Sequence, residues 1–292
     1  MIGRWVARVP PTVLVLLAIL SSQFGAGLAR TQFDAVGSLG ATFLRLLFAA
    51  IILLAVLRPR MRTWTRRAWL SALLLGVALA GMNTMIYLAF ETVPLGVAVT
   101  IEFLGPLVLA LTQTRRFTDA LWAVLALVGV VLLGFDLHGS IGFIGLVFAA
   151  GAGTFWAGYI LASANVGRNI PGIDGLAVAM AIGAVLAAPL GWHGAVAAVQ
   201  QPLVLVAFVG VAALSSALPY ALELTALRRI PTRIFGVLSS LGPAVAAIAG
   251  FVVLRQALGL QQITALLLVT IASIGITLAG GRREKPRLEP LG

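Results

Sequence analysis

Long apolar stretches recur along this sequence and limit what the chain can fold into. Crossing the roughly 30 Å hydrocarbon core of a bilayer takes a helix of about 20 predominantly apolar residues. Ten stretches meet or approach that length, at 11–29, 38–57, 69–90, 93–113, 119–136, 141–163, 173–191, 202–227, 233–254 and 261–280. The connections between them are too short to fold independently. The sequence therefore predicts an all-α membrane protein with ten transmembrane helices in one membrane domain.

The charged residues fix a predicted orientation. Only 10% of the 292 residues are charged, whereas a soluble domain carries about a quarter. If the N-terminus lies in the cytoplasm, every Lys and Arg except Arg30, Arg45 and Arg255 falls on a cytoplasmic segment. We therefore expect both termini to be cytoplasmic, in a multi-pass protein of the bacterial inner membrane. The net charge of +11 then faces anionic membrane lipids, and a nucleic-acid partner is not needed to explain it.

The two halves of the chain resemble each other. Val-Pro at 93–94 and Leu-Gly-Pro at 104–106 recur as Ile-Pro at 230–231 and Leu-Gly-Pro at 241–243. Each half then contains five spans, and because five is odd, the second half enters the membrane inverted relative to the first. Inverted repeats are a common construction of secondary transporters, in which alternating access exposes one site to each side in turn.

The repeat predicts a division into a first five-helix repeat at 1–137, a second, inverted repeat at 138–281 and a cytoplasmic tail at 282–292. Paired Gly/Pro interruptions at corresponding positions are a pointer to a transport path. We interpret four such residues as a hinge, with packing kinks as the alternative: Gly105, Pro106, Gly242 and Pro243.

Polar side chains inside the hydrocarbon mark a candidate site, because each costs free energy to insert. Gln23, Arg45, Asn83 and Glu102 all lie about 10 to 14 Å below the predicted periplasmic ends of their helices. We interpret Arg45 as a partner for a substrate carboxylate. Glu102 would then meet an ammonium group and exchange a proton when substrate is absent. The alternative is a structural ion pair between Arg45 and Glu102.

Further candidates lie on other helices. Glu223 is either a binding or gating residue or an interfacial partner of Arg228 and Arg229. Four aromatic residues could line a cavity and meet an ammonium group through a cation–π contact, although packing is a common role for such residues: Tyr87, Trp156, Tyr159 and Tyr220.

Several of these stretches resemble a known family. The similar segments are 81–83, 87–89, 92–99, 102–106, 217–223 and 231–236. They resemble the EamA-type exporters of the drug/metabolite transporter superfamily, and among these the exporters of threonine and homoserine. The resemblance implies export of amino acids from the cytoplasm by antiport driven by the proton gradient. It departs at Gly242, where relatives often carry Glu, and at Arg255 and Gln256, where an acidic residue is common.

Other functions remain as alternatives. The same fold could export another small metabolite or a drug, and a passive channel would show flux without saturation or counterflow. A membrane enzyme would need a nucleophile–base pair or a metal cluster, but the chain has no cysteine and only His138 and His193. We therefore expect no enzyme activity, no metal and no cofactor. No Walker A pattern occurs, and a monomer is expected to be sufficient.

Overall fold

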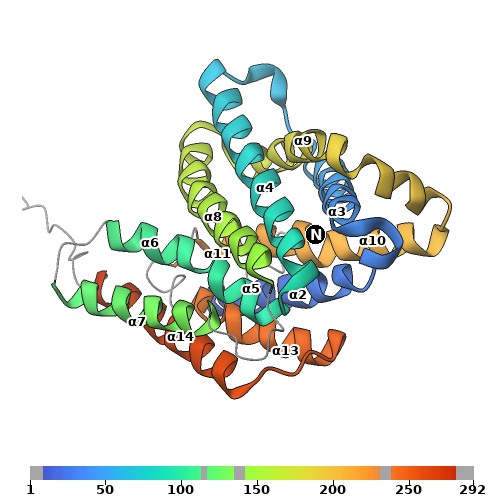
Figure 1. Ribbon diagram of the computed structural model, residues 1–292. Helices are drawn as coiled ribbons and strands as arrows, with labels where there is room; N and C mark the ends of the chain where they lie inside the picture. The colour runs from blue at the N-terminus through green and yellow to red at the C-terminus, as the bar shows by residue number, and fades with distance from the viewer. Residues whose placement is uncertain (1–8, 113–116, 135–141, 228, 231–237, 281–292) are drawn as a thin grey trace, which may run out of the picture.

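The computed structural model of the protein describes residues 9–112, 117–134, 142–227, 229–230 and 238–280. Within these ranges every regular element is a helix (Figure 1). The first half contains α2 (Pro11–Arg30), α3 (Phe33–Leu57), the short 3-10 helix η1 (Met61–Thr63), α4 (Arg66–Thr92), α5 (Leu95–Glu102), α6 (Leu104–Thr112) and α7 (Phe117–Gly134). The second half contains α8 (Phe143–Asn169), α9 (Asp174–Val199), α10 (Pro202–Ala212), the π-helical segment η2 (Ala213–Ala217), α11 (Leu218–Leu227), α13 (Gly242–Leu254) and α14 (Leu260–Gly280).

The apolar helices confirm an all-helical membrane protein. Six are long and apolar enough to cross a bilayer: α2, α3, α4, α8, α9 and the continuous run from α10 into α11. Four shorter apolar helices lie at Leu95–Leu109, Leu121–Leu132, Gly242–Leu254 and Leu260–Gly275. These helices correspond to the ten predicted spans, although α8 and α9 extend to Asn169 and Val199, beyond the predicted ends. The first part of the predicted span at 233–254 and the predicted tail at 282–292 lie outside the described residues, and α13 covers Gly242–Leu254.

Local sequence explains where helices begin and bend. Pro11 occupies the first turn of α2, where its missing N–H costs nothing. The Thr65 side chain caps α4 by accepting from the N–H of Ala68. Gly37 bends α3 by adopting a φ of +70°, a left-handed conformation that glycine enters at no steric cost. A short helical stretch precedes this bend, so α3 begins at Phe33, before the predicted span at 38–57.

Two membrane segments, the fourth and the eighth, depart from regular α-helix near their middle. The hydrogen bonding of the fourth segment is interrupted beside Phe103, between α5 and α6, because Pro106 has no N–H for the carbonyl of Glu102. Phe103 itself keeps helical dihedral angles. The eighth segment contains the π-helical η2, and such insertions are frequent at functional sites. The predicted hinge residues lie beside breaks, because Gly105 and Pro106 are in the first turn of α6 and Gly242 and Pro243 open α13.

Helices from the two halves of the chain pack against one another. α3 lies against α9, and α4 lies between α8 and α9, which together form the upper group in Figure 1. Below them, α2 packs on α11 and α13, α5 packs on α13, and α7 packs on α14. The two groups meet where η2 contacts α2 and α3, and where α5 and α6 contact α8. Neither half therefore forms a separate body.

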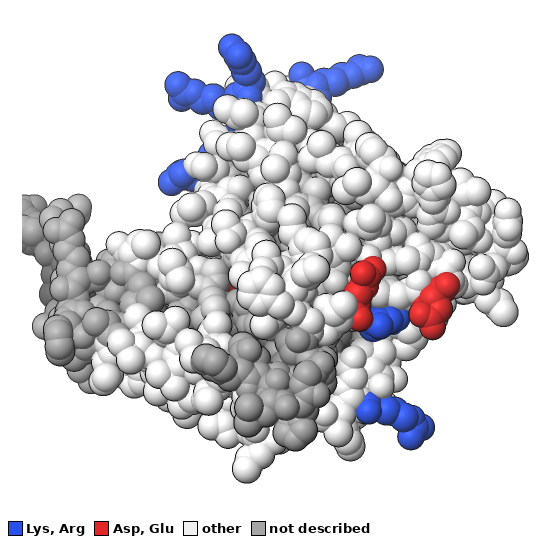
Figure 2. All heavy atoms as spheres, in the orientation of Figure 1, with Lys and Arg blue, Asp and Glu red and all other residues white. Residues whose placement is uncertain are grey.

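The surface suits a lipid environment. Most of the face in Figure 2 is uncharged, and many large apolar side chains are exposed, Leu203 at 85% and Phe143 at 77% among them. Arginine side chains project at the top of this view, over the loop that joins α3 to α4. A soluble monomer rarely exposes apolar area on this scale, so lipid tails are its natural cover.

Candidate functional site

Arg45 on α3 is a buried cation at the junction of the two helix groups, with 5% of its surface exposed. Its Nε donates to the hydroxyl of Ser216 at 2.7 Å, and its Nη2 donates to the carbonyl oxygen of Ser215 at 2.6 Å. Its Nη1 donates to the hydroxyl of Tyr87 at 3.0 Å. A guanidinium has five N–H donors, so three hydrogen bonds leave two donors for a ligand.

α4 supplies the wall beside Arg45. Tyr87 is fully buried and its ring lies 5.2 Å from the guanidinium carbon of Arg45. Asn83 lies one turn earlier, and its side-chain amide donates to the carbonyl oxygen of Leu79 at 2.7 Å. The Asn83 side chain also lies close to the hydroxyl of Tyr220. Asn83 and Tyr87 therefore face the same interior space at helical spacing.

Glu102 ends α5 at the interruption of the fourth segment and is 9% exposed. It lies within electrostatic range of Arg45 and Tyr220. Among the described residues Arg45 donates to the three oxygens named above and forms no ion pair with Glu102. The predicted roles of Arg45 and Glu102, in substrate binding or as a structural pair, therefore both stay predictions. Arg45 and Glu102 are thus two buried groups of opposite charge, and Arg45 bonds to other partners in this conformation.

The second half of the chain completes the site. The rings of Tyr159 on α8 and Tyr220 on α11 lie 5.7 Å apart, and both side chains are buried. Glu223, one turn beyond Tyr220, lies within electrostatic range of both tyrosines. The side chain of Glu223 is half-buried, and Arg228, one of its two predicted interfacial partners, lies outside the described residues. Glu223 therefore belongs with the interior groups.

These residues form one group, which we call the polar cluster. Its members come from α3, α4, α5, α8, η2 and α11: Arg45, Asn83, Tyr87, Glu102, Tyr159, Ser215, Ser216, Tyr220 and Glu223. It places one guanidinium and two carboxyl groups inside a membrane domain, where ionisable groups mark substrate or ion pathways. Cation and acids in such proximity can hold a zwitterion.

Two predicted site residues are not brought into the polar cluster. Gln23 on α2 is half-buried, and no hydrogen bond joins it to another described residue. Trp156 on α8 packs edge-on against Phe103, with ring centroids 5.1 Å apart. Because the hydrogen bonding of the fourth segment is interrupted beside Phe103, Trp156 supports the interruption next to Glu102.

The two predicted hinge glycines differ sharply in their surroundings. A Cβ added to Gly105 would lie 1.8 Å from the carbonyl oxygen of Gly153 on α8. A Cβ added to Gly242 would meet no atom within 4 Å. Gly105 therefore allows two backbones to touch beside Glu102, whereas Gly242 has no such task in this conformation.

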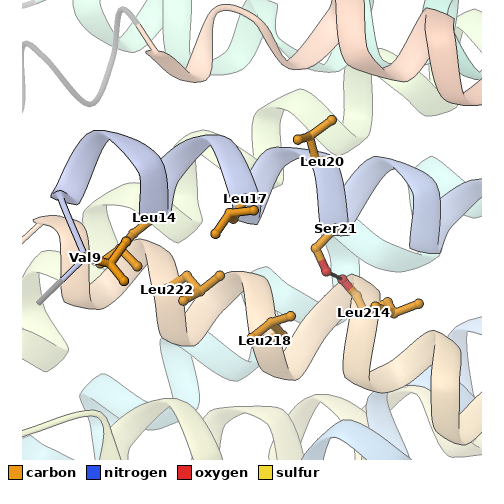
Figure 3. Close-up of a pocket in the computed structure, with 8 residues that line it drawn as sticks. All are labelled: Val9, Leu14, Leu17, Leu20, Ser21, Leu214, Leu218 and Leu222. Atoms are coloured by element: carbon orange, nitrogen blue, oxygen red, sulfur yellow. Dashed lines mark hydrogen bonds between the residues drawn. The ribbon is translucent and has the colours of Figure 1, made fainter. Parts of the chain in front are cut away.

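An apolar groove of about 400 Å³ lies on the surface, between α2 and the eighth segment. Figure 3 shows its lining, in which Ser21 is the single polar side chain. The Ser21 hydroxyl donates to the carbonyl oxygen of Leu214 in η2. Four of its six leucines are exposed at the apolar surface, so we assign the groove to lipid contact and not to the polar site: Leu17, Leu20, Leu214 and Leu218.

Sequence reasoning missed two residues of the polar cluster and a third contact at the far end of α5. Ser215 and Ser216 meet Arg45, and Gln256 accepts from the N–H of Leu95 at the start of α5, at 3.0 Å. One signal was available, because Pro219 lacks an N–H and so frees the carbonyl oxygen of Ser215 four residues earlier. No feature of the sequence predicted the hydrogen bond between Leu95 and Gln256.

Comparison with known proteins identifies the family. Residues 143–278 match the EamA-like transporter family. The chain is 40% identical over 282 residues to the threonine/homoserine exporter RhtA of Salmonella typhimurium (strain SL1344), covering 96% of this chain and 94% of the relative. It is 41% identical over 278 residues to the threonine/homoserine exporter RhtA of Escherichia coli (strain K12), covering 94% of each.

A solved crystal structure shares the fold, with a TM-score of 0.63 at 20% identity over 94% of this chain and 99% of the other. That likeness concerns architecture only. The family resemblance predicted from the sequence segments is thus confirmed by relatives that match along nearly the whole chain. The chain belongs to the EamA-like transporter family of the drug/metabolite transporter superfamily, as a multi-pass inner-membrane transporter and not an enzyme.

Proposed function

We propose that this protein exports threonine, homoserine and similar small amino acids from the cytoplasm, in exchange for protons. The polar cluster carries the proposal, because it offers complementary groups to both ends of a zwitterion. Arg45 has two N–H donors free for a carboxylate, and Glu102 and Glu223 supply negative charge for an ammonium group. The relatives' names point to the same substrates. A single chain is sufficient, and the proton gradient replaces any cofactor.

The mechanism we propose is alternating access by two inverted repeats, at 1–137 and 138–281. The helix pairings support it, because they persist when the repeats are exchanged. α3 with α9, α5 with α13, and α7 with α14 each join equivalent segments. The pairing of α4 with α8 corresponds to that of α11 with α2. Such a pseudo-two-fold arrangement allows the repeats to swap conformations and open the site to the opposite side.

The proposed orientation places the loop between α3 and α4 in the cytoplasm. Its arginines share one end of the bundle with Arg168, because the neighbouring Asn169 donates to Ser71 near the start of α4. The cysteine-free chain allows a direct check by single substitutions at exposed positions. An impermeant thiol reagent applied to intact cells should label Thr31→Cys and spare Thr63→Cys. The reverse pattern would refute the orientation.

Counterflow in proteoliposomes tests the transport function. Vesicles preloaded with unlabelled threonine should accumulate labelled threonine or homoserine transiently, because a carrier exchanges substrate across the membrane. An imposed pH gradient should raise net flux. A panel of the other amino acids and of unrelated metabolites defines selectivity, with protein-free vesicles as the control. Absence of threonine and homoserine counterflow, or flux that does not saturate, would exclude this function in favour of another cargo or a channel.

Replacing Glu102 by Gln should separate exchange from proton coupling. We expect Glu102→Gln to keep threonine counterflow at saturating threonine, with a raised KM because one negative charge near the ammonium group is lost. It should lose most of the stimulation by a pH gradient, because the amide keeps the shape but cannot carry a proton. Glu91→Gln is the matched control, since Glu91 is exposed at the end of α4, outside the polar cluster. Equal stimulation in Glu102→Gln and the unmodified protein would show that Glu102 is not the coupling group.

A further inference from the structure

Two carbonyl groups in the eighth membrane segment lack their helical donors. In an α-helix the carbonyl of Leu214 bonds to the N–H of Leu218, and that of Ser215 to the N–H of residue 219. Here the Leu218 N–H donates to Ala213 instead, five residues back, as the π-helical η2 requires. Residue 219 is a proline and has no N–H. The π segment and Pro219 therefore free two adjacent carbonyl oxygens inside the membrane.

Side chains from other helices cover both oxygens. Ser21 on α2 donates its hydroxyl to Leu214, as Figure 3 shows, and Arg45 on α3 donates from Nη2 to Ser215 at 2.6 Å. A carbonyl without a donor is costly in hydrocarbon, so each needs a replacement. The two replacements differ in kind. Ser21 is a neutral group in the lipid-facing groove, whereas Arg45 is the cation of the polar cluster.

This difference has a consequence for substrate binding. A substrate carboxylate that binds the two free N–H donors of Arg45 draws the guanidinium toward the substrate and away from the carbonyl oxygen of Ser215, to which Nη2 donates in this conformation. The carbonyl oxygen of Ser215 then loses the hydrogen bond that it accepts from Arg45 on α3. An α-amino acid brings its own replacement, because its ammonium group carries three N–H donors close to its carboxylate.

We propose that the carbonyl oxygen of Ser215, freed by Pro219, is the ammonium subsite of the transporter, and that Arg45 covers it until the amino acid inserts between them. This inference rests on the proposed amino-acid export and deepens it. The zwitterion replaces one direct Arg45–Ser215 hydrogen bond with a bridge through both of its charges. Molecules with a carboxylate but no amine leave the carbonyl without a donor and are rejected on that ground.

The inserted substrate also separates α3 from η2, which Arg45 otherwise ties together. Because these elements belong to different halves of the chain, binding loosens one contact between the two helix groups. Backbone carbonyls at helix interruptions are used in the same way by other transporters, in which broken helices present them to cations.

The test compares threonine with its des-amino analogue, 3-hydroxybutyrate, as inhibitors of threonine counterflow in proteoliposomes. In the unmodified protein threonine should bind at least about 50-fold more tightly, because its ammonium group adds charge-assisted hydrogen bonds that the analogue cannot make. Pro219→Ala restores an N–H that bonds to Ser215, so the preference should fall by about tenfold, through weaker binding of threonine. Pro219→Gly supplies the same N–H and should give the same loss if the alanine variant folds poorly.

Pro189→Ala is the matched control, since Pro189 is an exposed proline inside α9, away from the polar cluster. It should keep the preference of the unmodified protein. An unchanged preference in both Pro219 variants, with threonine counterflow intact, would overturn the ammonium subsite and leave the proposed function standing. No threonine or homoserine counterflow in the unmodified protein would overturn both. A preference near one in the unmodified protein would also overturn the subsite.

Discussion

Replacing Gly105 by Ala should destabilise this transporter severely. The added methyl carbon would lie 1.8 Å from the carbonyl oxygen of Gly153 and 2.4 Å from its carbonyl carbon. These are backbone atoms of α8, so no change of rotamer relieves the clash, and α6 must move away from α8. We expect a loss of about 3 kcal/mol or more. The thermal midpoint in detergent, measured by size-exclusion chromatography after heating, should fall by about 5 to 10 °C.

Gly242→Ala is the matched control, at the corresponding position of the second half. An added Cβ there meets no atom within 4 Å, so its thermal midpoint should stay within about 2 °C of the unmodified protein. Comparison of Gly105→Ala with Gly242→Ala also distinguishes a packing role from a hinge role, because only Gly105 contacts a neighbouring backbone. If Gly105→Ala left the midpoint unchanged, the close approach of α6 to α8 would not be a feature of the folded transporter.

Replacing Arg45 by Gln should abolish transport while leaving a folded protein in the membrane. The guanidinium is the only buried cation of the polar cluster, and its loss removes the partner that we assign to the substrate carboxylate. Loss of a contact worth about 3 kcal/mol corresponds to about 100-fold weaker binding. Labelled-threonine counterflow at substrate concentrations near the KM of the unmodified protein should fall to background. Arg45→Lys keeps the charge but not the planar fork, so its counterflow should be intermediate.

Arg30 provides a control with similar local contacts. Its Nε donates to the carbonyl oxygen of Phe90 at 2.8 Å, and its guanidinium carbon lies 4.9 Å from the ring centre of Phe33. Arg45 likewise donates from Nε and lies over an aromatic ring, but within the polar cluster. Arg30→Gln should therefore retain counterflow. Full counterflow by Arg45→Gln would show that Arg45 has a structural role only.

Much of the candidate site could be predicted from the sequence, because polar groups in apolar spans carry a free-energy cost that demands a reason. That argument selected Arg45, Asn83 and Glu102, which the fold brings to one place. It also selected Gln23, which the fold leaves half-buried and outside the polar cluster. Depth along a helix is readable from sequence, whereas the direction in which the side chain points depends on how that helix is rotated against its neighbours.

Partnerships between distant residues could not be predicted in this way. Arg45 was paired with Glu102 in one interpretation, yet it donates to Ser215 and Ser216, 170 and 171 residues away. Gln256 covers the start of α5 across 161 residues. Pairing of this kind arises only when helices of the two halves pack together, and the residue types alone permit many pairings.

The sequence by itself determined the membrane helices and the family, because span length and apolar content follow directly from the hydrocarbon thickness, and long matching segments persist among relatives. Only the tertiary structure decided that Gly105 touches a neighbouring backbone while its counterpart Gly242 does not. It likewise decided that the carbonyl freed by Pro219 is covered by Arg45. The physical reason is that helix rotation and separation are set by packing over the whole bundle, and residues with identical local sequence can face different neighbours.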